Sequence, residues 1–233
     1  MNYQKFQKIR VFIGYDSNET VAYHTCAQSI LENSSIPVEF FPLKLNLFKK
    51  FYKRKKRKLD STEFSISRFL TPYLSDYQGL SLYVDCDFIF LDDVAKLFKY
   101  SKNNRSKSIW CVNHNYIVKD KKKFLGNKQY KYSKKNWSSL MLFNNSKCKM
   151  LTPKFIEKAN GLFLHQFKWL KNYQVGKIDK KWNVLVGEQS IPKNPKAIHF
   201  TVGGPYFKKY KSASMAKYWK DYFKKTIYPV KKI

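Results

Sequence analysis

The sequence predicts an α/β fold with a mainly parallel central sheet flanked by helices, in a single domain. Residues 9–14, IRVFIG, are a short apolar run with β-branched residues, which is typical of a buried strand. Residues 20–35 carry apolar side chains at helical spacing, and Ser17 or Asn18 is the expected N-cap. Residues 36–43, IPVEFFPL, then predict a second strand. This β-α-β opening favours a parallel sheet with its ligand at the carboxyl ends of the strands.

The later elements follow the same apolar patterns, and no linker interrupts them. Residues 65–79 predict a helix that stops around Pro72 or continues past it with a kink. Further predicted elements are strands at 80–84 and 88–91, strands within 108–114 and 137–145, a helix pair or broken helix at 151–170 with Pro153 near its first turn, and a short strand within 196–206 that runs into a Gly-Gly-Pro turn.

The composition narrows the class of protein and of partner. Of 233 residues, 43% are hydrophobic and 18% aromatic, which excludes wholesale disorder. The 46 basic residues outnumber 16 acids, for a formal charge of +30, but only five are Arg. This excess is either a compositional bias or an adaptation to polyanions such as sugar nucleotides, phosphorylated glycans, acidic membranes or nucleic acid. Residues 44–60, nearly all basic and aromatic, are either a solvated face or a basic loop that guides an anionic acceptor.

Scattered cysteines and the absence of long apolar runs predict a cytoplasmic protein. Cys26, Cys86, Cys111 and Cys148 form no CxxC pair, which suits reduced thiols and argues against a zinc ribbon. We expect neither a signal peptide nor a membrane span. In the tail, residues 208–233, lysines alternate with aromatics. The tail is either an amphipathic helix packed on the domain or a peripheral contact with the anionic inner face of the cell membrane.

Two aspartates at the end of an apolar strand are the most informative feature. Asp85 and Asp87 follow LSLYV and precede FIFL, in a chain that has few acids. Both carboxylates reach one ion if the chain turns there, and burying both charges is costly without a cation. A hard cation such as Mn²⁺ or Mg²⁺ takes oxygen ligands and bridges carboxylates to a diphosphate. His199 follows another short apolar strand, so its imidazole is a candidate third ligand.

Several segments, taken in order, resemble glycosyltransferase family 8, a family of sugar-nucleotide-dependent transferases with the Rossmann-like GT-A fold. The likeness covers most of residues 9–207, which would form the transferase domain ahead of the 208–233 tail. The segments are IRVFIGYDSNETVAYHTCAQSI, STEFSISRFLTPYL, LYVDCDFIFLDDVAKLF, NWSSLMLFNN, LVGE and IHFTVGGPYF.

The resemblance implies a metal site and a donor site. Asp85, Asp87 and His199 would bind Mn²⁺ or Mg²⁺, and a UDP-sugar donor would bind beside them. Tyr15 would stack on the nucleotide base, and Asp16 would accept a hydrogen bond from the uracil N–H. The other residues that the resemblance places at the donor are Gly14, Arg68, Cys86, Ser138, Ser139, Gly203 and Gly204.

The resemblance also indicates catalytic residues, and the sequence departs from it at one lysine. His165 and Gln166 would lie around the anomeric centre. The family often carries a diphosphate-binding lysine after the late glycines, where this chain has Tyr206. Lys208 or Lys209 is the expected substitute.

A retaining reaction is implied, in which the leaving phosphate takes the proton of the acceptor hydroxyl and no strong protein base is required. If the enzyme inverts instead, Glu188 is the leading candidate base, followed by Asp179. The expected acceptor is a glycan or a lipid-linked sugar. The alternatives are a glycosyltransferase acting on modified bases of nucleic acid and a non-enzymatic basic nucleic-acid-binding protein, although the chain has no recognisable RNA-binding or zinc-finger motif.

Overall fold

The computed structural model describes residues 8–55, 57, 60–102, 104, 106–118, 123–126 and 130–228. Parts of two predicted segments, namely residues 56, 58 and 59 of the basic run and 229–233 of the tail, lie outside the described residues. The strands are β1 (Ile9–Gly14), β2 (Val38–Leu43), β3 (Leu80–Val84), β4 (Phe88–Phe90), β5 (Ile109–Val112), β6 (Leu140–Asn144), β7 (Val175–Ile178), β8 (Val184–Leu185) and β9 (Ala197–His199).

The strands form a six-stranded sheet in the order β2-β1-β3-β6-β5-β7 and a three-stranded sheet in the order β4-β9-β8. In the larger sheet β1 pairs in parallel with β2 and β3, and β5 pairs in parallel with β7. Strand β6 runs antiparallel to both of its neighbours. The predicted α/β fold with a mainly parallel sheet is confirmed, and the reversed β6 brings its amino end beside the carboxyl end of β3.

The helices differ from the predictions at two places. The helices are α1 (Thr20–Glu32), α2 (Phe64–Ser67), α3 (Ala95–Phe98), α4 (Pro153–Lys158), α5 (Gly161–His165) and α6 (Ala216–Ile227). The N-cap of α1 is Glu19, so the prediction of Ser17 or Asn18 is wrong. The reason is an Asx turn, in which Asp16 Oδ1 accepts from the Asn18 N–H at 2.9 Å and delays the first helical turn.

The segment predicted as one helix at 65–79 is broken into short pieces. Helix α2 ends at Ser67, and 3₁₀ turns follow at Arg68–Leu70 and Tyr73–Ser75. Pro72, between the turns, has no N–H for a helical hydrogen bond, and the chain leaves the helical region at Asp76, where φ is 52°. The helix pair within 151–170 is confirmed as α4 and α5, with Pro153 at the first turn of α4.

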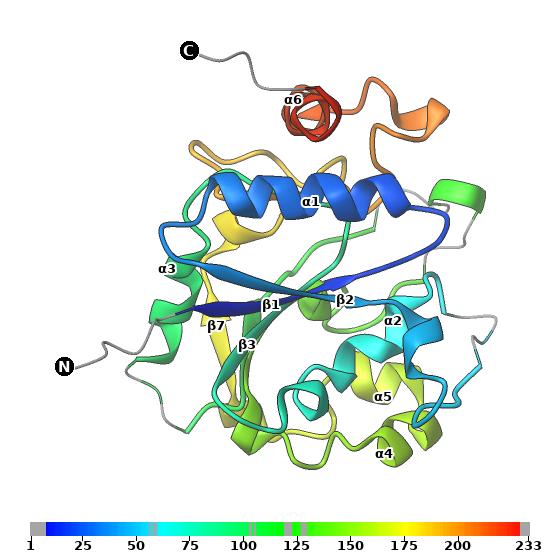
Figure 1. Ribbon diagram of the computed structural model, residues 1–233, viewed down its shortest axis with the longest axis vertical. Coiled ribbons are helices and arrows are strands. Elements are labelled where there is room, and N and C mark those ends of the chain that lie inside the picture. The colour runs from blue at the N-terminus through cyan, green and yellow to red at the C-terminus, as the bar shows by residue number, and fades with distance from the viewer. Residues whose placement is uncertain are drawn as a thin grey trace.

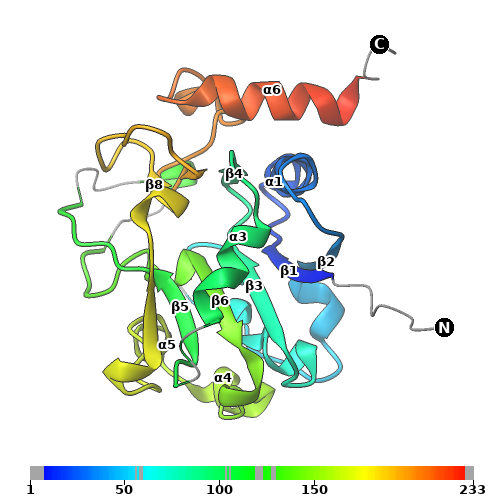
Figure 2. The same cartoon turned by 90° about the vertical axis from the view of Figure 1, so that its left-hand side faces the viewer.

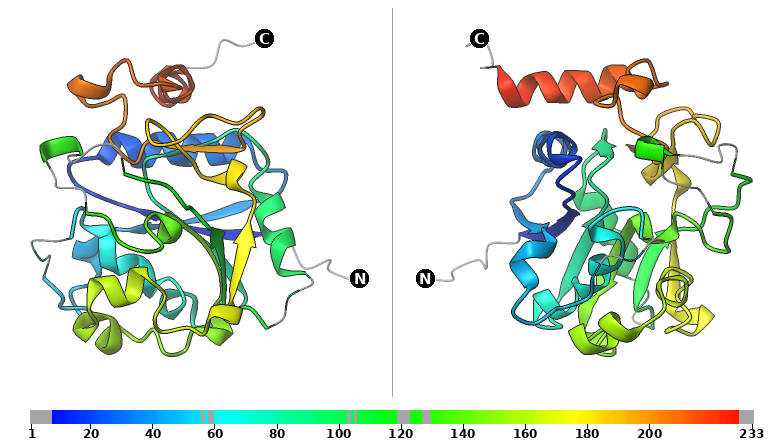
Figure 3. Two further views of the ribbon diagram at one scale, coloured as in Figure 1. Left: turned by 180° about the vertical axis from the view of Figure 1, so that it is seen from behind. Right: turned by 90° about the vertical axis from the view of Figure 1, so that its right-hand side faces the viewer.

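Helices cover both faces of the main sheet (Figure 1). Helix α1 lies over one face, with α6 stacked on its outer side, whereas α2, α4 and α5 lie at the opposite end of the molecule (Figures 2 and 3). Trp219 of α6 is 4% exposed and packs in a core cluster with residues of β4, β8 and β9. The tail helix therefore packs on the domain as the amphipathic alternative expects, while the membrane contact stays a prediction. Among the described residues, no helix is both long and apolar enough to cross a bilayer.

Candidate metal and nucleotide-sugar site

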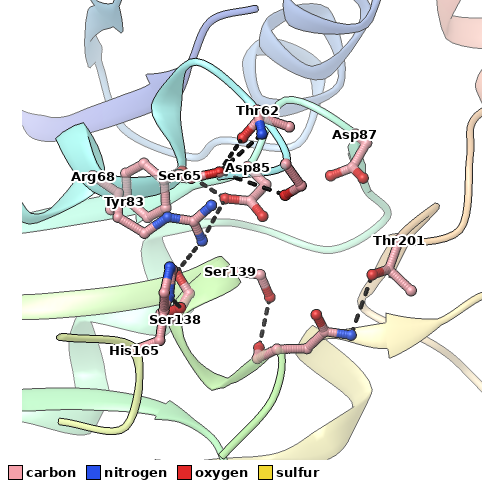
Figure 4. A network of polar contacts seen from close by, with 12 residues as sticks. Thr62, Ser65, Arg68, Tyr83, Asp85, Asp87, Ser138, Ser139, His165 and Thr201 are labelled. Atoms are coloured by element: carbon pink, nitrogen blue, oxygen red, sulfur yellow. Dashed lines mark hydrogen bonds and ion pairs between the residues drawn. The ribbon is translucent and has the colours of Figure 1, made fainter. Parts of the chain in front are cut away.

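The two aspartates lie in a turn at the carboxyl end of β3. After Val84 the chain turns through Asp85, Cys86 and Asp87 before β4 begins. The Asp85 N–H donates to the carbonyl of Ser139 at 2.9 Å, which ties the turn to the residue that precedes β6. The turn brings both carboxylates to one side, where Figure 4 shows them beside each other. This is the condition under which the sequence predicted that one cation could be shared.

His199 completes a cluster of three potential metal ligands. In the small sheet it pairs with Phe88, the residue after Asp87, and the two rings stack with centroids 4.3 Å apart. One ligand atom from each of Asp85, Asp87 and His199 lies within 4.8 Å of the others. The three predicted ligands therefore come together at the point where β3, β4 and β9 meet.

A chain of hydrogen bonds orients the imidazole. Ser139 Oγ donates to the Asn136 carbonyl at 2.7 Å, so it accepts from Asn183 Nδ2 at 2.9 Å. Asn183 Oδ1 therefore faces His199 Nδ1 at 3.0 Å, and that nitrogen carries the proton. In neutral His199 the Nε2 lone pair then points toward Asp87 Oδ1, 3.2 Å away.

This arrangement fits a divalent cation. Asp87 Oδ1 is buried and has no hydrogen-bond donor among the described residues. A lone pair facing a buried carboxylate oxygen is unfavourable unless a proton or a metal ion lies between them. Two carboxylates and one imidazole suit Mn²⁺, and Mg²⁺ is compatible with the carboxylates.

Burial and the charges around the cluster shift the pKa values of Asp85 and Asp87 in opposite directions. Arg68 Nη1 donates to Asp85 Oδ1 at 2.9 Å and to the Ser138 carbonyl at 2.8 Å, and the Tyr83 hydroxyl donates to Asp85 Oδ1 at 2.5 Å (Figure 4). Burial raises the pKa of Asp85 even so, because the Arg68 charge compensates only part of the lost solvation. Burial also opposes ionisation of Asp87, but a protonated His199 would supply a positive charge and a hydrogen bond, which lower the pKa of Asp87 below the usual value.

A cavity of about 590 Å³ opens beside the cluster. At its wall Ser138 Oγ and His165 Nδ1 lie 2.7 Å apart, and burial together with the Arg68 and Arg54 charges lowers the pKa of His165 to about 3. His165 is therefore neutral and serves as a hydrogen-bonding group. The sequence-predicted residues that line the cavity are Arg68, Asp85, Asp87, Ser138, Ser139, His165 and His199.

The residues predicted at the nucleotide base lie at the end of β1, outside the cavity wall. A Cβ on Gly14 would lie 2.6 Å from the Phe64 ring, so close packing explains the glycine. Tyr15 contacts Tyr23 with ring centroids 5.5 Å apart. The carboxylate of Asp16 accepts backbone N–H groups of Asn18 and Glu63. These contacts define local structure, and the binding roles of Gly14, Tyr15 and Asp16 stay predictions.

Three further predicted residues also lie outside the cavity wall. Cys86 is buried, and burial raises the pKa of its thiol, so it packs as a neutral side chain. Gln166 ends α5, where its backbone N–H donates to the Leu162 carbonyl. Glu188 is 3% exposed, and its charge acts on Lys123 and Lys135.

The late glycines pack against tyrosine rings. A Cβ on Gly203 would lie 2.3 Å from the Tyr210 ring, and one on Gly204 would lie 2.0 Å from the Tyr206 ring. Lys208 is exposed and does not line the cavity. The structure thus offers no contact that supports Lys208 as the substitute for the family's lysine.

Sequence reasoning missed an acid and two lysines at the cavity. Glu19 is 2% exposed and accepts a hydrogen bond from the Tyr206 hydroxyl. Burial and the nearby Asp87 charge raise the pKa of Glu19 to about 8. Lys123 and Lys135 also line the cavity, and burial lowers the pKa of both, that of Lys135 to about 8. The scarcity of acids was a signal for Glu19, whereas nothing in a lysine-rich loop distinguishes these two lysines.

One relative decides the family. A search for matching family models finds none. Protein CDI of Arabidopsis thaliana is 43% identical over 219 residues, which are 90% of this chain and 84% of that protein. The chain therefore belongs to the Protein CDI family.

Solved structures show the fold of this Protein CDI family member. The bifunctional glycosyltransferase WbbM aligns with a TM-score of 0.64 at 11% identity over 97% of this chain, and GlyE of Streptococcus pneumoniae TIGR4 with 0.64 at 13% over 93%. This chain spans 51% of WbbM and 60% of GlyE. The galactosyltransferase LgtC, in complex with donor and acceptor sugar analogues, aligns with 0.59 at 11% identity, over 96% of this chain and 98% of LgtC. The predicted GT-A fold is confirmed.

Proposed function

We propose that this member of the Protein CDI family is a metal-dependent glycosyltransferase of the family 8 type. It would move a sugar from a UDP-linked donor to a hydroxyl of a glycan or lipid-linked acceptor, with retention. One observation carries the proposal: His199 Nε2 faces Asp87 Oδ1, which has no hydrogen-bond donor among the described residues, and both lie beside Asp85 in the wall of a cavity in a GT-A fold. A divalent cation would compensate the buried carboxylates of this cluster, and the cavity next to it leaves room for a diphosphate sugar.

Each residue of the cluster has a role in holding the donor. Asp85, Asp87 and His199 would bind Mn²⁺ or Mg²⁺, which when bound neutralises charge on the departing diphosphate. Arg68 holds Asp85 in position through its 2.9 Å ion pair. Ser138 and His165 present hydrogen-bonding groups to the sugar from the wall of the cavity.

Lys123 and Lys135 are better placed to bind the diphosphate than Lys208. Burial lowers the pKa of both lysines, and the charge of Lys123 adds to the effect on Lys135. A phosphate group between them would relieve that repulsion and favour their charged forms. Tyr206, at the position where the lysine was sought, directs its hydroxyl to Glu19 instead.

Retention is supported by the position of the candidate base. Glu188 does not line the cavity, whereas a base for inversion must reach the acceptor hydroxyl opposite the leaving phosphate. In retention the departing phosphate takes that proton itself. NMR assignment of the anomeric configuration of the product tests this point, because a β-linked product from an α-linked donor would exclude retention.

The activity is tested with a panel of sugar nucleotides in the presence of Mn²⁺, scored for thermal stabilisation and for donor hydrolysis. We expect UDP-sugars to raise the melting temperature and Asp87→Ala to abolish both responses, since ligand linkage is lost with the metal. Asp221→Asn, on the exposed face of α6, is the matched control and keeps both. A full response of Asp87→Ala would overturn the proposal.

A further inference from the structure

Three of the five arginines of this chain line the cavity. Arg is scarce, five residues among 46 bases, yet Arg54, Arg57 and Arg68 all line the cavity wall. Arg68 is paired with Asp85, whereas the other two come from the basic segment that precedes α2. Since lysine would satisfy a requirement for charge alone, guanidinium groups at one place indicate recognition of planar anionic groups.

Backbone carbonyls hold the Arg54 guanidinium in place. Its side chain is buried, with 8% of the residue exposed. Nη1 donates to the carbonyls of Ile156, Glu157 and Ala159 at 3.1, 3.1 and 2.7 Å, at the end of α4. The Nε–H is buried and has no acceptor among the described residues. Because Nε is closed to solvent, a ligand in the cavity meets the positive charge of a guanidinium that three backbone carbonyls hold in place, and not this donor.

The surroundings leave this end of the cavity positive. Arg57 and Lys131 also line the cavity and are exposed, and Asp60 is the acid of the wall that contacts Arg57 and whose charge acts on Arg54. Asp60 accepts the backbone N–H of Arg57 at 2.9 Å, and its charge acts on Arg54, but no ion pair joins Asp60 to either arginine. The positive charge of the wall is therefore only partly compensated by protein groups.

We infer that this end of the cavity, formed by Arg54, Arg57 and Asn160, is a subsite for an acidic sugar. The carboxylate of the sugar pairs with the guanidinium groups, and Asn160 contributes polar contacts to its hydroxyls. The acidic sugar is either the transferred sugar of the donor or the acceptor, because Arg54, whose charge acts on His165, lines the same cavity as the metal cluster. The inference rests on the proposed function, since it names the substrate class of the same cavity.

Two binding measurements on the full chain with Mn²⁺ distinguish the sources. The donor measurement compares UDP-glucuronate with UDP-glucose. The acceptor measurement, made at saturating UDP, compares methyl glucuronide with methyl glucoside. We expect the acidic probe to bind about tenfold more tightly in one of the two, as a charge-assisted pair with arginine would give.

Arg57→Gln tests the subsite without disturbing the buried contacts of Arg54. We expect this variant to reduce the preference for the acidic probe at least threefold, whereas Lys55→Gln, an exposed base of the same segment that does not line the cavity, retains it. Equal binding of acidic and neutral probes in both measurements, or a preference that Arg57→Gln leaves intact, overturns the inference alone. If UDP itself fails to bind with Mn²⁺, the proposed function fails and the inference fails with it.

Discussion

Replacing Asn183 with Ala tests whether the hydrogen bond behind His199 determines metal affinity. The substitution removes the acceptor for His199 Nδ1–H, at 3.0 Å, and the donor to Ser139 Oγ, at 2.9 Å. Nothing then fixes the tautomer that presents the Nε2 lone pair to Asp87. Loss of such a partner of a ligating histidine costs roughly 10- to 100-fold in metal affinity, or about 1.4–2.7 kcal/mol.

The assay is calorimetric titration with Mn²⁺, with Asn145→Ala as the control. Asn145 is also buried, and its amide donates to Gln78 and Ser81 at 2.8 and 2.9 Å. These contacts lie at the amino end of β3, opposite the end that carries the Asp85–Asp87 turn. We expect Asn145→Ala to lower stability but to leave Mn²⁺ affinity unchanged. Asn183→Asp keeps an acceptor for Nδ1–H and should recover most of the affinity. Wild-type affinity in Asn183→Ala, or an equal loss in the control, would refute the reasoning.

Three other predictions concern Glu19, Lys135 and Trp219. The pKa of Glu19 is about 8 in the folded chain against an ordinary 4.5, so its protonated form stabilises the fold below pH 4.5 and that contribution disappears as the pH rises through 8. With a chelator present, the unfolding free energy of wild type, measured by urea titration, should fall by about 4 kcal/mol over this pH range, and that of Glu19→Gln should not. Parallel curves of unfolding free energy against pH for the two proteins would contradict the assignment. Lys135→Gln should weaken UDP binding in the presence of Mn²⁺ several-fold without changing Mn²⁺ affinity, so an unchanged UDP affinity counts against the diphosphate role. Trp219→Ala should cost about 3–5 kcal/mol, while the exposed neighbour Tyr218→Ala costs below about 0.5 kcal/mol; similar urea midpoints for the two would show that α6 does not pack as described.

The meeting of the three candidate metal ligands was predictable because local pattern determines their position. An apolar strand followed by Asp-Cys-Asp places these acids at a strand end, and His199 is the last residue of β9. Glu19 and Asn183 were not predictable in the same way, because their roles come from contacts with Tyr206 and His199 that only the folded chain brings together. Hydrogen bonds between residues far apart in the chain leave no periodic pattern in the amino-acid sequence.

The break of the predicted helix at 65–79 has a similar cause. Arg68 leaves the regular α-helix in a 3₁₀ turn, and its side chain is held between Asp85 and Ser138, which come from the ends of two different strands. Helical periodicity alone therefore predicted a longer element than the one that forms, because these tertiary contacts are not encoded in the local spacing of apolar residues.

The pairing of β4 with β9 has a consequence for biosynthesis. Asp85 and Asp87 leave the ribosome long before His199, and the imidazole reaches them only when β9 adds to the edge of β4. The helix that follows then fastens onto α1 through Tyr222 with Asn33 and through Lys225 with Glu32. A nascent chain in which β9 has not yet formed consequently has two candidate ligands, Asp85 and Asp87, without His199, so tight metal binding at this cluster would have to wait until β9 pairs with β4.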